Sequence, residues 1–235
     1  MNRQGPNGIG YCTYTWNPIT GCEFGCDYCY ASEIVEERLC KNPKLAHHYP
    51  DGFAPTFHAE RLDQPFKHKK SERIFVVDMG DLFGDWVPAT WITDISNAIA
   101  KAPWHTYLFL TKNPKRYLDC TFAKNHWVGT TIEHEKHYQK RSSPFWGNHL
   151  ADNIKWVSME PLMSDMPVDS AFDWIVVGER SDIKYTDESW NEVVAWAGNI
   201  IDQAKDMHVP IFIKNKLGKY YPQRQLPKEK VSGDG

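Results

Sequence analysis

Three cysteines stand close together near the start of the chain, in the stretch GCEFGCDYCYA that runs from Gly21 to Ala31. Cys22, Cys26 and Cys29 have the spacing C-x3-C-x2-C, which brings three thiolates within reach of one metal centre. Cysteine thiolates are the usual ligands of iron–sulfur clusters, whose full set is four. Three protein ligands leave one iron open to a substrate or cofactor, so the spacing favours a catalytic 4Fe–4S cluster.

Two other interpretations of the cysteines remain open. One is a zinc site with a fourth ligand such as a histidine, although zinc ribbons usually present two paired C-x2-C units and this chain has one such pair. The other is a set of buried structural thiols, which two short gaps in succession make less favourable. Cys12, Cys40 and Cys120 stand apart from the pattern and are expected to be small buried side chains rather than ligands.

Short apolar runs alternate with amphipathic stretches along the 235 residues. Runs of four to six apolar residues are typical of strands in a covered parallel sheet. We expect a first strand around 10–14, before the cysteines. Six further strands are predicted at 74–77, 107–110, 127–132, 154–158, 174–177 and 209–213. Helices are predicted at 32–39, 91–101, 114–124, 133–141 and 189–207. This alternation predicts an α/β fold with right-handed crossovers, an open, partial β/α barrel whose mostly parallel sheet has about six to seven strands.

Composition sets limits on the class of protein. Hydrophobic residues make up 41% of the chain and charged residues 24%, which is ordinary globular usage. We expect one domain over residues 1–221 and a polar tail, frayed in solution, over 222–235. The formal charge of −3 gives no global basic field for nucleic acid, and no apolar run reaches the ~20 residues of a membrane span. The polar start, 1–10, has no apolar signal core, so we expect a cytoplasmic protein with reduced thiols and no membrane partner.

The C-x3-C-x2-C run with Tyr28 before its last cysteine resembles the signature of the radical S-adenosylmethionine (SAM) superfamily. Within it, the chain resembles a phage and bacterial family of small three-Cys-motif proteins of unknown function. The segments that carry this resemblance are YTWNPITGCEFGCDYCYA, HTYLFLTKNPKRY, WVGTTIEHE, VSMEPL, WIVVGE and VPIFIK. They occur in this order over most of the chain. The chain departs from the family at 179–182, which reads ERSD where the family usually has GESG.

The resemblance implies a mechanism and its cofactors. In such enzymes SAM chelates the open iron of the 4Fe–4S cluster through its amino and carboxylate groups. The reduced cluster cleaves SAM to methionine and a 5′-deoxyadenosyl radical, which abstracts hydrogen from a substrate. A flavodoxin- or ferredoxin-type protein is the expected electron donor. The sequence does not name the substrate, and phage relatives make a nucleotide or a nucleic acid a candidate.

Polar residues recur just after the apolar strands, where ligands of parallel sheets gather. Gly80 and Asp81 occupy the place of the superfamily's segment that receives the SAM amino group, and Tyr28 would flank the adenine. The other candidates for cofactor binding are Thr130, Thr131, Glu133, Ser158, Glu160 and Lys214, with Lys112 as a similar case. Each has a simpler interpretation as a strand residue, a helix cap or a solvated charge.

The sequence therefore supports a radical SAM enzyme first. The alternative is a non-catalytic zinc or iron–sulfur binding module, associated with nucleic acid. A third possibility is an α/β enzyme without redox chemistry, in which the cysteine loop is incidental.

Overall fold

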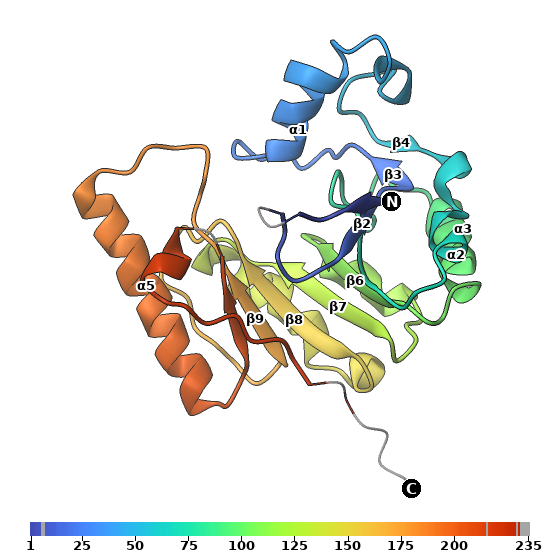
Figure 1. Ribbon diagram of the computed structural model, residues 1–235. Helices are drawn as coiled ribbons and strands as arrows, with labels where there is room; N and C mark the ends of the chain where they lie inside the picture. Colours follow the sequence, from blue (N-terminus) through green and yellow to red (C-terminus); the bar gives the residue numbers. More distant parts are fainter. Residues whose placement is uncertain (6–7, 215, 229, 231–235) are drawn as a thin grey trace, which may run out of the picture. The chain divides into compact units, whose positions relative to one another are not determined.

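The computed structural model describes residues 1–5, 8–214, 216–228 and 230. The chain forms two compact units, Met1–Asn113 and Pro114–Gly235, called here the first and the second unit and described separately (Figure 1). The expectation of one domain over 1–221 stays a prediction.

The first unit is built on four neighbouring strands in the order β1-β2-β5-β6. Their bounds are β1 Asn2–Arg3, β2 Tyr14–Trp16, β5 Arg73–Val76 and β6 Thr106–Thr111. β2, β5 and β6 pair in parallel, whereas β1 is antiparallel to β2. Helix α3, Ala89–Ala100, makes the crossover from β5 to β6 and buries Ile95, Ala98 and Ile99. The apolar residues of this helix recur every three or four positions, as a helix covering a sheet requires.

The first strand lies further along the chain than predicted. Gly10 has a φ of +86°, outside the strand region, and the pairing of β2 with β5 begins only at Tyr14. The cysteine loop consequently follows β3, Ile19–Thr20, which pairs antiparallel with β4, Thr56–Phe57.

Short helical turns fill the rest of the connection between β2 and β5. α1, Tyr30–Ile34, continues directly into a π-helical turn, Val35–Leu39. The sequence predicts no regular structure in 42–70, and the structure places there two 3-10 turns, β4 and one short helix. The helical pieces are Ala46–His48, Ala59–Arg61 and α2, Gln64–Lys67.

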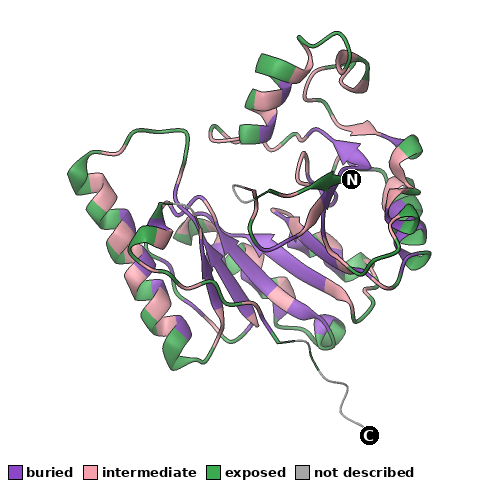
Figure 2. Ribbon diagram, viewed as in Figure 1, coloured by how far each residue is buried: buried purple, intermediate pink, exposed green. Residues whose placement is uncertain are grey.

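The second unit holds four parallel strands in the order β7-β8-β9-β10. Their bounds are β7 His126–Thr131, β8 Ile154–Met159, β9 Trp174–Val177 and β10 Ile211–Ile213. α5, Asp187–Asp206, joins β9 to β10 and starts with a capping box between Thr186 and Ser189. Its buried stripe faces the strands and its other side is exposed (Figure 2). The shorter pieces are Pro114–Asp119, Glu135–His137, α4 Tyr138–Ser142, Ser143–Phe145, Asn148–Leu150 and Leu217–Lys219.

The predicted fold class is confirmed: the fold is α/β and mostly parallel. Of the large sheet's strands, four lie in each unit, rather than six or seven in all, and the first unit also holds the pair β3 and β4. One expectation about the tail is wrong. The amide of Ile213 donates to Gln223 O at 2.9 Å and the amide of Gln225 donates to Ile211 O at 3.0 Å, so this part of the tail adds hydrogen bonds to β10. Residues 229 and 231–235 lie outside the described part. Among the described residues, no helix is both long and apolar enough to cross a bilayer.

Candidate metal centre and cofactor-binding residues

The base of the cysteine loop is fixed by backbone contacts in the first unit. Gly21 has a φ of +88°, and a Cβ there would lie 2.2 Å from Ala54 O. Its amide donates to Met79 O at 2.8 Å, and the amide of Cys22 donates to Phe53 O at 3.2 Å. Only glycine tolerates this conformation and this crowding, so the loop begins at a defined place.

Gly80 meets the cysteine loop directly. The two glycines 21 and 80 form a parallel bridge, and a Cβ on Gly80 would lie 2.6 Å from Gly21 O. The sequence assigns Gly80 to close approach of a ligand. The structure gives the glycine a different partner, the backbone of the loop that carries the cysteines. Gly80 thus has a structural role in the bridge to Gly21, and its ligand role stays a prediction.

The three cysteines are partly buried thiols that form no disulfide. Cys29 caps α1, with the amide of Ser32 3.5 Å from its sulfur. Burial raises the pKa of Cys22 to about 12, and the charges of Asp81, Cys26 and Cys29 add to the effect. The three sulfurs therefore lie within electrostatic reach of one another. A bound cation reverses this cost, because a thiol that coordinates a metal is deprotonated.

The remaining cysteines lie elsewhere in the chain's packing. Cys12 is buried, in line with the sequence, while Cys40 and Cys120 are partly exposed. The thiol of Cys120 lies 3.4 Å from Arg116 O, and that of Cys40 lies 3.9 Å from Tyr49 O. These contacts are to neighbouring backbone and do not bring either thiol into the cysteine loop.

Aromatic side chains flank the cysteine loop on two sides. Phe24 packs edge-on against Trp86, with 4.8 Å between the ring centroids. Lys112, just after β6, places its Nζ 5.4 Å from the centroid of the Tyr28 ring. Tyr28 and Lys112 are both candidates from the sequence, and the structure brings them together. A cation over an aromatic face is an attractive pair, so the two side chains restrain each other.

The sequence argument did not single out a partly buried polar cluster beside the loop. Asn17 Nδ2 donates to Asp78 Oδ1 at 2.6 Å, and Asn17 Oδ1 accepts the amide of Met79 at 3.1 Å. The hydroxyl of Tyr30 donates to Asp78 O at 2.7 Å. Burial raises the pKa of Asp78. The signal in the sequence is the polar residue that directly follows each of two apolar strands, Asn17 after 14–16 and Asp78 after 74–77.

The backbone next to Asp78 is strained. Val77, between β5 and Asp78, has a φ of +62°, which a β-branched residue rarely adopts. Its amide still donates to Trp16 O at 2.8 Å. Strained residues cluster at functional sites because the surrounding structure must hold them. The turn from β5 into the segment opposite the cysteine loop is thus held in a specific conformation.

Asp81 is engaged entirely within the first unit. One carboxylate oxygen accepts the hydroxyl of Thr111 at 2.7 Å and the amide of Phe83 at 2.9 Å, and the other accepts the amide of Lys112 at 3.0 Å. The residue is only 5% exposed. Burial raises the pKa of Asp81, and these hydrogen bonds oppose the shift. The carboxylate therefore joins the turn after β5 to the end of β6, and its predicted contact with a cofactor remains untested.

In the second unit, the small polar candidates end adjacent strands. Thr131 of β7 lies opposite Ser158 of β8 in the parallel register, with Thr130 one residue earlier. All three are at least 95% buried. They are strand residues at the carboxyl edge, and their hydroxyls are not open to bulk solvent.

Glu133 follows β7 and is paired with a cation. Its carboxylate accepts a hydrogen bond from Arg141 of α4 and lies 3.8 Å from His137 Nε2. Arg141 also donates to Thr131 O at 2.9 Å. The pair is nearly buried, with side-chain exposures of 8% and 11%. The sequence placed Glu133 in a helix, whereas it lies in the loop that precedes the 3-10 turn.

Glu160 and Lys214 meet, although 54 residues separate them. Lys214 Nζ donates to Glu160 Oε1 at 2.5 Å. Glu160 follows β8 and Lys214 follows β10, so both stand at carboxyl ends of strands. A Cβ on Gly178, which follows β9 between them, would lie 3.0 Å from the carboxyl group of Glu160. The Glu160 side chain is 24% exposed, so part of its carboxylate remains open to a ligand.

Glu179 is a second carboxylate that the sequence argument did not single out as a site. It is 3% exposed, and its oxygens accept the amides of Lys216 at 3.1 Å and Leu217 at 3.5 Å. It lies at the start of the segment that departs from the family pattern. Its neighbour Arg180 pairs instead with Asp182, at 2.9 Å.

Comparisons with known proteins place this arrangement among solved folds. Among proteins of curated function, none matches the sequence. The structure is similar to spore photoproduct lyase complexed with dinucleoside spore photoproduct, with a TM-score of 0.53 and 12% identity over 94% of this chain. A cysteine-to-serine mutant of that lyase gives 0.52 and 13%, again over 94%. The chain spans 64% of the length of both lyase chains. At these identities the likeness shows a shared fold.

A family match covers nearly the whole chain. The family model that matches residues 6–234 carries the description "Protein of unknown function (DUF5131)", without reference to phages. The relationship to phage proteins that the sequence suggests therefore stays a prediction. Since the match runs over 6–234, the chain belongs to the DUF5131 family.

Proposed function

We propose that this protein is a radical SAM enzyme in which Cys22, Cys26 and Cys29 hold a 4Fe–4S cluster. The observation that carries the proposal is the anchored loop with three thiols, on a fold similar to that of spore photoproduct lyase. Neither the three thiols nor the shared fold is sufficient alone. Three cysteines can bind zinc, and a shared fold does not define an activity.

The residues present fit such a cluster. The cysteines are free thiols, close in sequence and partly buried, and a metal centre would stabilise their deprotonated form. The described ligand atoms that lie within 4.8 Å of one another, close enough for a single ion, are those of His48, His58 and Glu60 rather than the three sulfurs. A cluster of four irons spreads its ligands more widely than one zinc ion does. The packing of Phe24 on Trp86 covers one side of the loop with apolar surface.

When bound, the cluster would supply one electron to cleave SAM and so generate a 5′-deoxyadenosyl radical. The chain's own residues would hold and orient the cofactor. In the first unit we assign this task to Tyr28 with Lys112, and to backbone near Gly80. In the second unit the partly open carboxylate of Glu160 and its partner Lys214 are the strongest candidates to contact a ligand. The buried groups Thr130, Thr131, Ser158 and Glu133 would shape and support that strand edge.

For the substrate we propose a nucleotide or a nucleic acid. The solved relatives include spore photoproduct lyase complexed with a dinucleoside spore photoproduct, a nucleotide-derived molecule. A flavodoxin- or ferredoxin-type donor would supply the electron, and the expected location is the cytoplasm. A non-catalytic zinc module is the competing function, and the first experiment separates the two.

The decisive experiment is anaerobic reconstitution with iron and sulfide. The wild-type chain should turn brown and hold about four irons. Cys22→Ala, Cys26→Ala and Cys29→Ala should each abolish the cluster absorption, whereas Cys12→Ala, Cys40→Ala and Cys120→Ala should retain it. Zinc that is lost in the Cys22, Cys26 and Cys29 variants, without visible absorption after reconstitution, would favour the binding module. Cluster loss in the Cys120 variant together with an intact Cys26 variant would refute the ligand assignment.

The reconstituted protein then tests the reaction. With dithionite as reductant, wild-type protein should release 5′-deoxyadenosine from SAM, and the three ligand variants should release none. Single-stranded DNA, RNA or a dinucleoside monophosphate should stimulate this release if the substrate class is correct. A protein that forms the cluster and cleaves SAM with no response to any of them would retain the radical SAM assignment and exclude the nucleotide proposal.

A further inference from the structure

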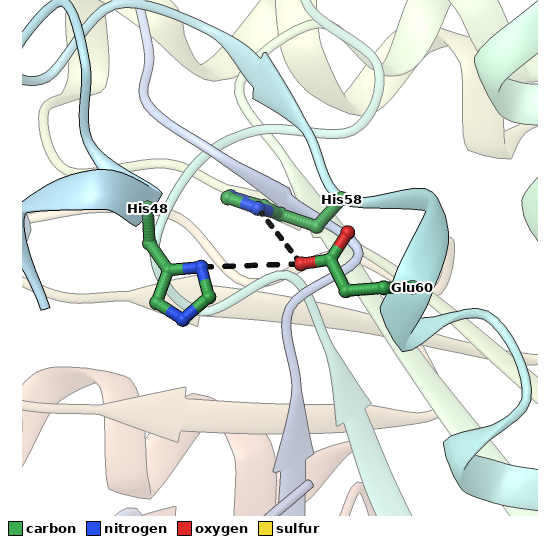
Figure 3. A group of neighbouring side chains, drawn as sticks. All are labelled: His48, His58 and Glu60. Carbon is green, nitrogen blue, oxygen red and sulfur yellow. Dashed lines mark ion pairs between the residues drawn. The ribbon is translucent and has the colours of Figure 1, made fainter.

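A second group of metal-type ligands lies in the first unit, apart from the cysteines. His48, His58 and Glu60 each offer one ligand atom, and these three atoms lie within 4.8 Å of one another (Figure 3). Both imidazoles present Nδ1 to the same oxygen. Glu60 Oε1 is 3.5 Å from His58 Nδ1 and 3.9 Å from His48 Nδ1. From this geometry we propose that the three side chains form a structural site for a divalent transition metal of the zinc type.

The distances agree with such an ion. Zinc binds imidazole nitrogen and carboxylate oxygen at roughly 2.0–2.2 Å, which puts tetrahedral ligand atoms about 3.3–3.5 Å apart. The two separations from Glu60 Oε1, 3.5 and 3.9 Å, are close to these values, and all three ligand atoms lie within 4.8 Å of one another. Two imidazoles and one carboxylate are a ligand set that zinc uses in proteins, with the fourth position taken by water. The side chain of Glu60 is 59% exposed, which leaves that position accessible.

The buried histidine is held in the orientation that ligation requires. His58 is 4% exposed, and its Nε2 lies 2.8 Å from the hydroxyl oxygen of Thr20. Metal binding at Nδ1 needs the tautomer with hydrogen on Nε2, and Thr20 Oγ1 can accept that hydrogen. Partners of this kind fix the ring of a ligating histidine. The amide of His58 also donates to Pro18 O at 2.8 Å, so backbone and ring are both fixed.

An arginine lies beside the carboxylate of this group. Arg61 itself has Nε 3.5 Å from Glu60 Oε1 and donates from Nη1 to Asn17 O at 3.0 Å. An arginine that forms an ion pair with a ligating carboxylate is an ordinary outer partner, and Glu60 has lone pairs for both the ion and the arginine.

The position of this group suggests what the ion does. Thr20 immediately precedes Gly21, at the start of the cysteine loop. Between His48 and His58 runs the segment 49–57, whose Phe53 O accepts the amide of Cys22 at 3.2 Å. An ion at His48, His58 and Glu60 would join both ends of this segment. It would thereby stabilise the backbone against which the cysteine loop starts, without contact to the cysteines.

The test uses the full chain with Cys22, Cys26 and Cys29 all changed to alanine, so that zinc cannot bind to the loop. Zinc binding is measured by competition with a chromophoric chelator. We expect one zinc per chain, and at least a tenfold loss of affinity in His48→Ala and in Glu60→Gln, both of which change partly exposed side chains. His149→Ala and Glu192→Gln, in the second unit, are the matched controls and should bind as the parent does. Thr20→Val should weaken binding by about 10- to 100-fold while leaving all three ligands in place.

A second readout is independent of affinity. Zinc should slow hydrogen exchange at the amide of Cys22 and along 49–57 in the parent, but not in the Glu60→Gln variant. Absence of zinc binding in the triple-cysteine background, or equal binding by the His48, Glu60 and control variants, would overturn the proposal. Either result would leave the cluster assignment untouched, because the cysteines are absent from every sample.

Discussion

Asp81 in the first unit and Glu160 in the second are both carboxylates that follow a buried strand, yet they are bound differently. Asp81 is 5% exposed and accepts three hydrogen bonds from neutral donors, among them the amides of Phe83 and Lys112. The Glu160 side chain is 24% exposed and is paired with the charged Lys214.

The difference indicates a structural role for Asp81 and a ligand-binding role for Glu160. Two of these donors are backbone amides and the third is the hydroxyl of the buried Thr111, so Asp81 is committed to holding the turn after β5 against β6. The ammonium of Lys214 ends a flexible four-carbon stem, so a ligand can share or replace it. The comparison therefore predicts that substitution of Asp81 acts on the fold, whereas substitution of Glu160 acts on binding.

The largest effect is expected for Asp81→Ala. The change leaves the hydroxyl of Thr111 and two amides without their buried acceptor, so the free energy of unfolding should fall by about 3–5 kcal/mol. Urea unfolding of the metal-free chain measures this loss. Asp94→Ala, at an exposed position of α3, is the control and should change the free energy of unfolding by less than about 0.5 kcal/mol. A fully stable Asp81→Ala chain that binds SAM weakly would instead support the ligand role predicted from the sequence.

The nearly buried pair of Glu133 and Arg141 comes next. Arg141→Met removes the partner of a carboxylate whose side chain is 8% exposed, together with the hydrogen bond to Thr131 O. We expect unfolding to become easier by about 3 kcal/mol. The double variant Glu133→Gln, Arg141→Met should recover part of this loss, because no uncompensated charge remains. Equal losses in the single and double variants would show that Glu133 is already neutralised by another group.

Glu160→Gln should have a smaller effect, and on a different quantity. The free energy of unfolding should change by less than about 1 kcal/mol, as for other partly exposed ion pairs. The affinity of the reconstituted protein for SAM should fall by about 2 kcal/mol, roughly 30-fold, for one charged hydrogen bond lost. Cluster absorption and SAM binding are measured on the same sample, with Glu192→Gln as the control. Wild-type affinity in the variant would make Glu160 a substrate residue or a structural partner of Lys214.

The strands were predictable because buried apolar runs define them almost alone. The run 174–177 coincides with β9, and β6, β7 and β8 differ from their predictions by one residue at each affected end. The shifts that remain have backbone causes. β5 ends before Val77, whose φ is positive, and β10 begins after Pro210, which has no amide hydrogen to donate. Neither cause can be deduced from hydrophobicity.

The candidate site was predictable as a set of residue types, but their partners were not. Spacing singles out the cysteines, and position after a strand singles out Asp81 and Glu160. Which of the two carboxylates is saturated depends on Thr111 and Lys214, which lie 30 and 54 residues away in the sequence. The same holds for His48, which meets His58 and Glu60 only because the segment 49–57 folds back between them. Side-chain pairs of such sequence separation require the tertiary structure.

The smallest expected effect concerns a histidine and extends the comparison of the two units to pH. In the first unit, burial lowers the pKa of His58 and the charge of Glu60 opposes the shift. In the second unit, burial is the sole cause that lowers the pKa of His126, to about 4. Nδ1 of His126 accepts the amide of Ala123 at 3.2 Å, which requires the neutral ring. Between pH 6.5 and 4 the unfolded chain binds a proton at this residue and the folded chain does not, so stability falls as the pH is lowered through that range. His126→Gln removes this contribution, and its free energy of unfolding should therefore decrease less than that of the wild type between pH 7 and pH 4.5. His47→Gln, at an exposed imidazole, should keep the wild-type difference. An unchanged pH dependence in the His126 variant would mean that the ring binds its proton over the same pH range in the folded and the unfolded chain.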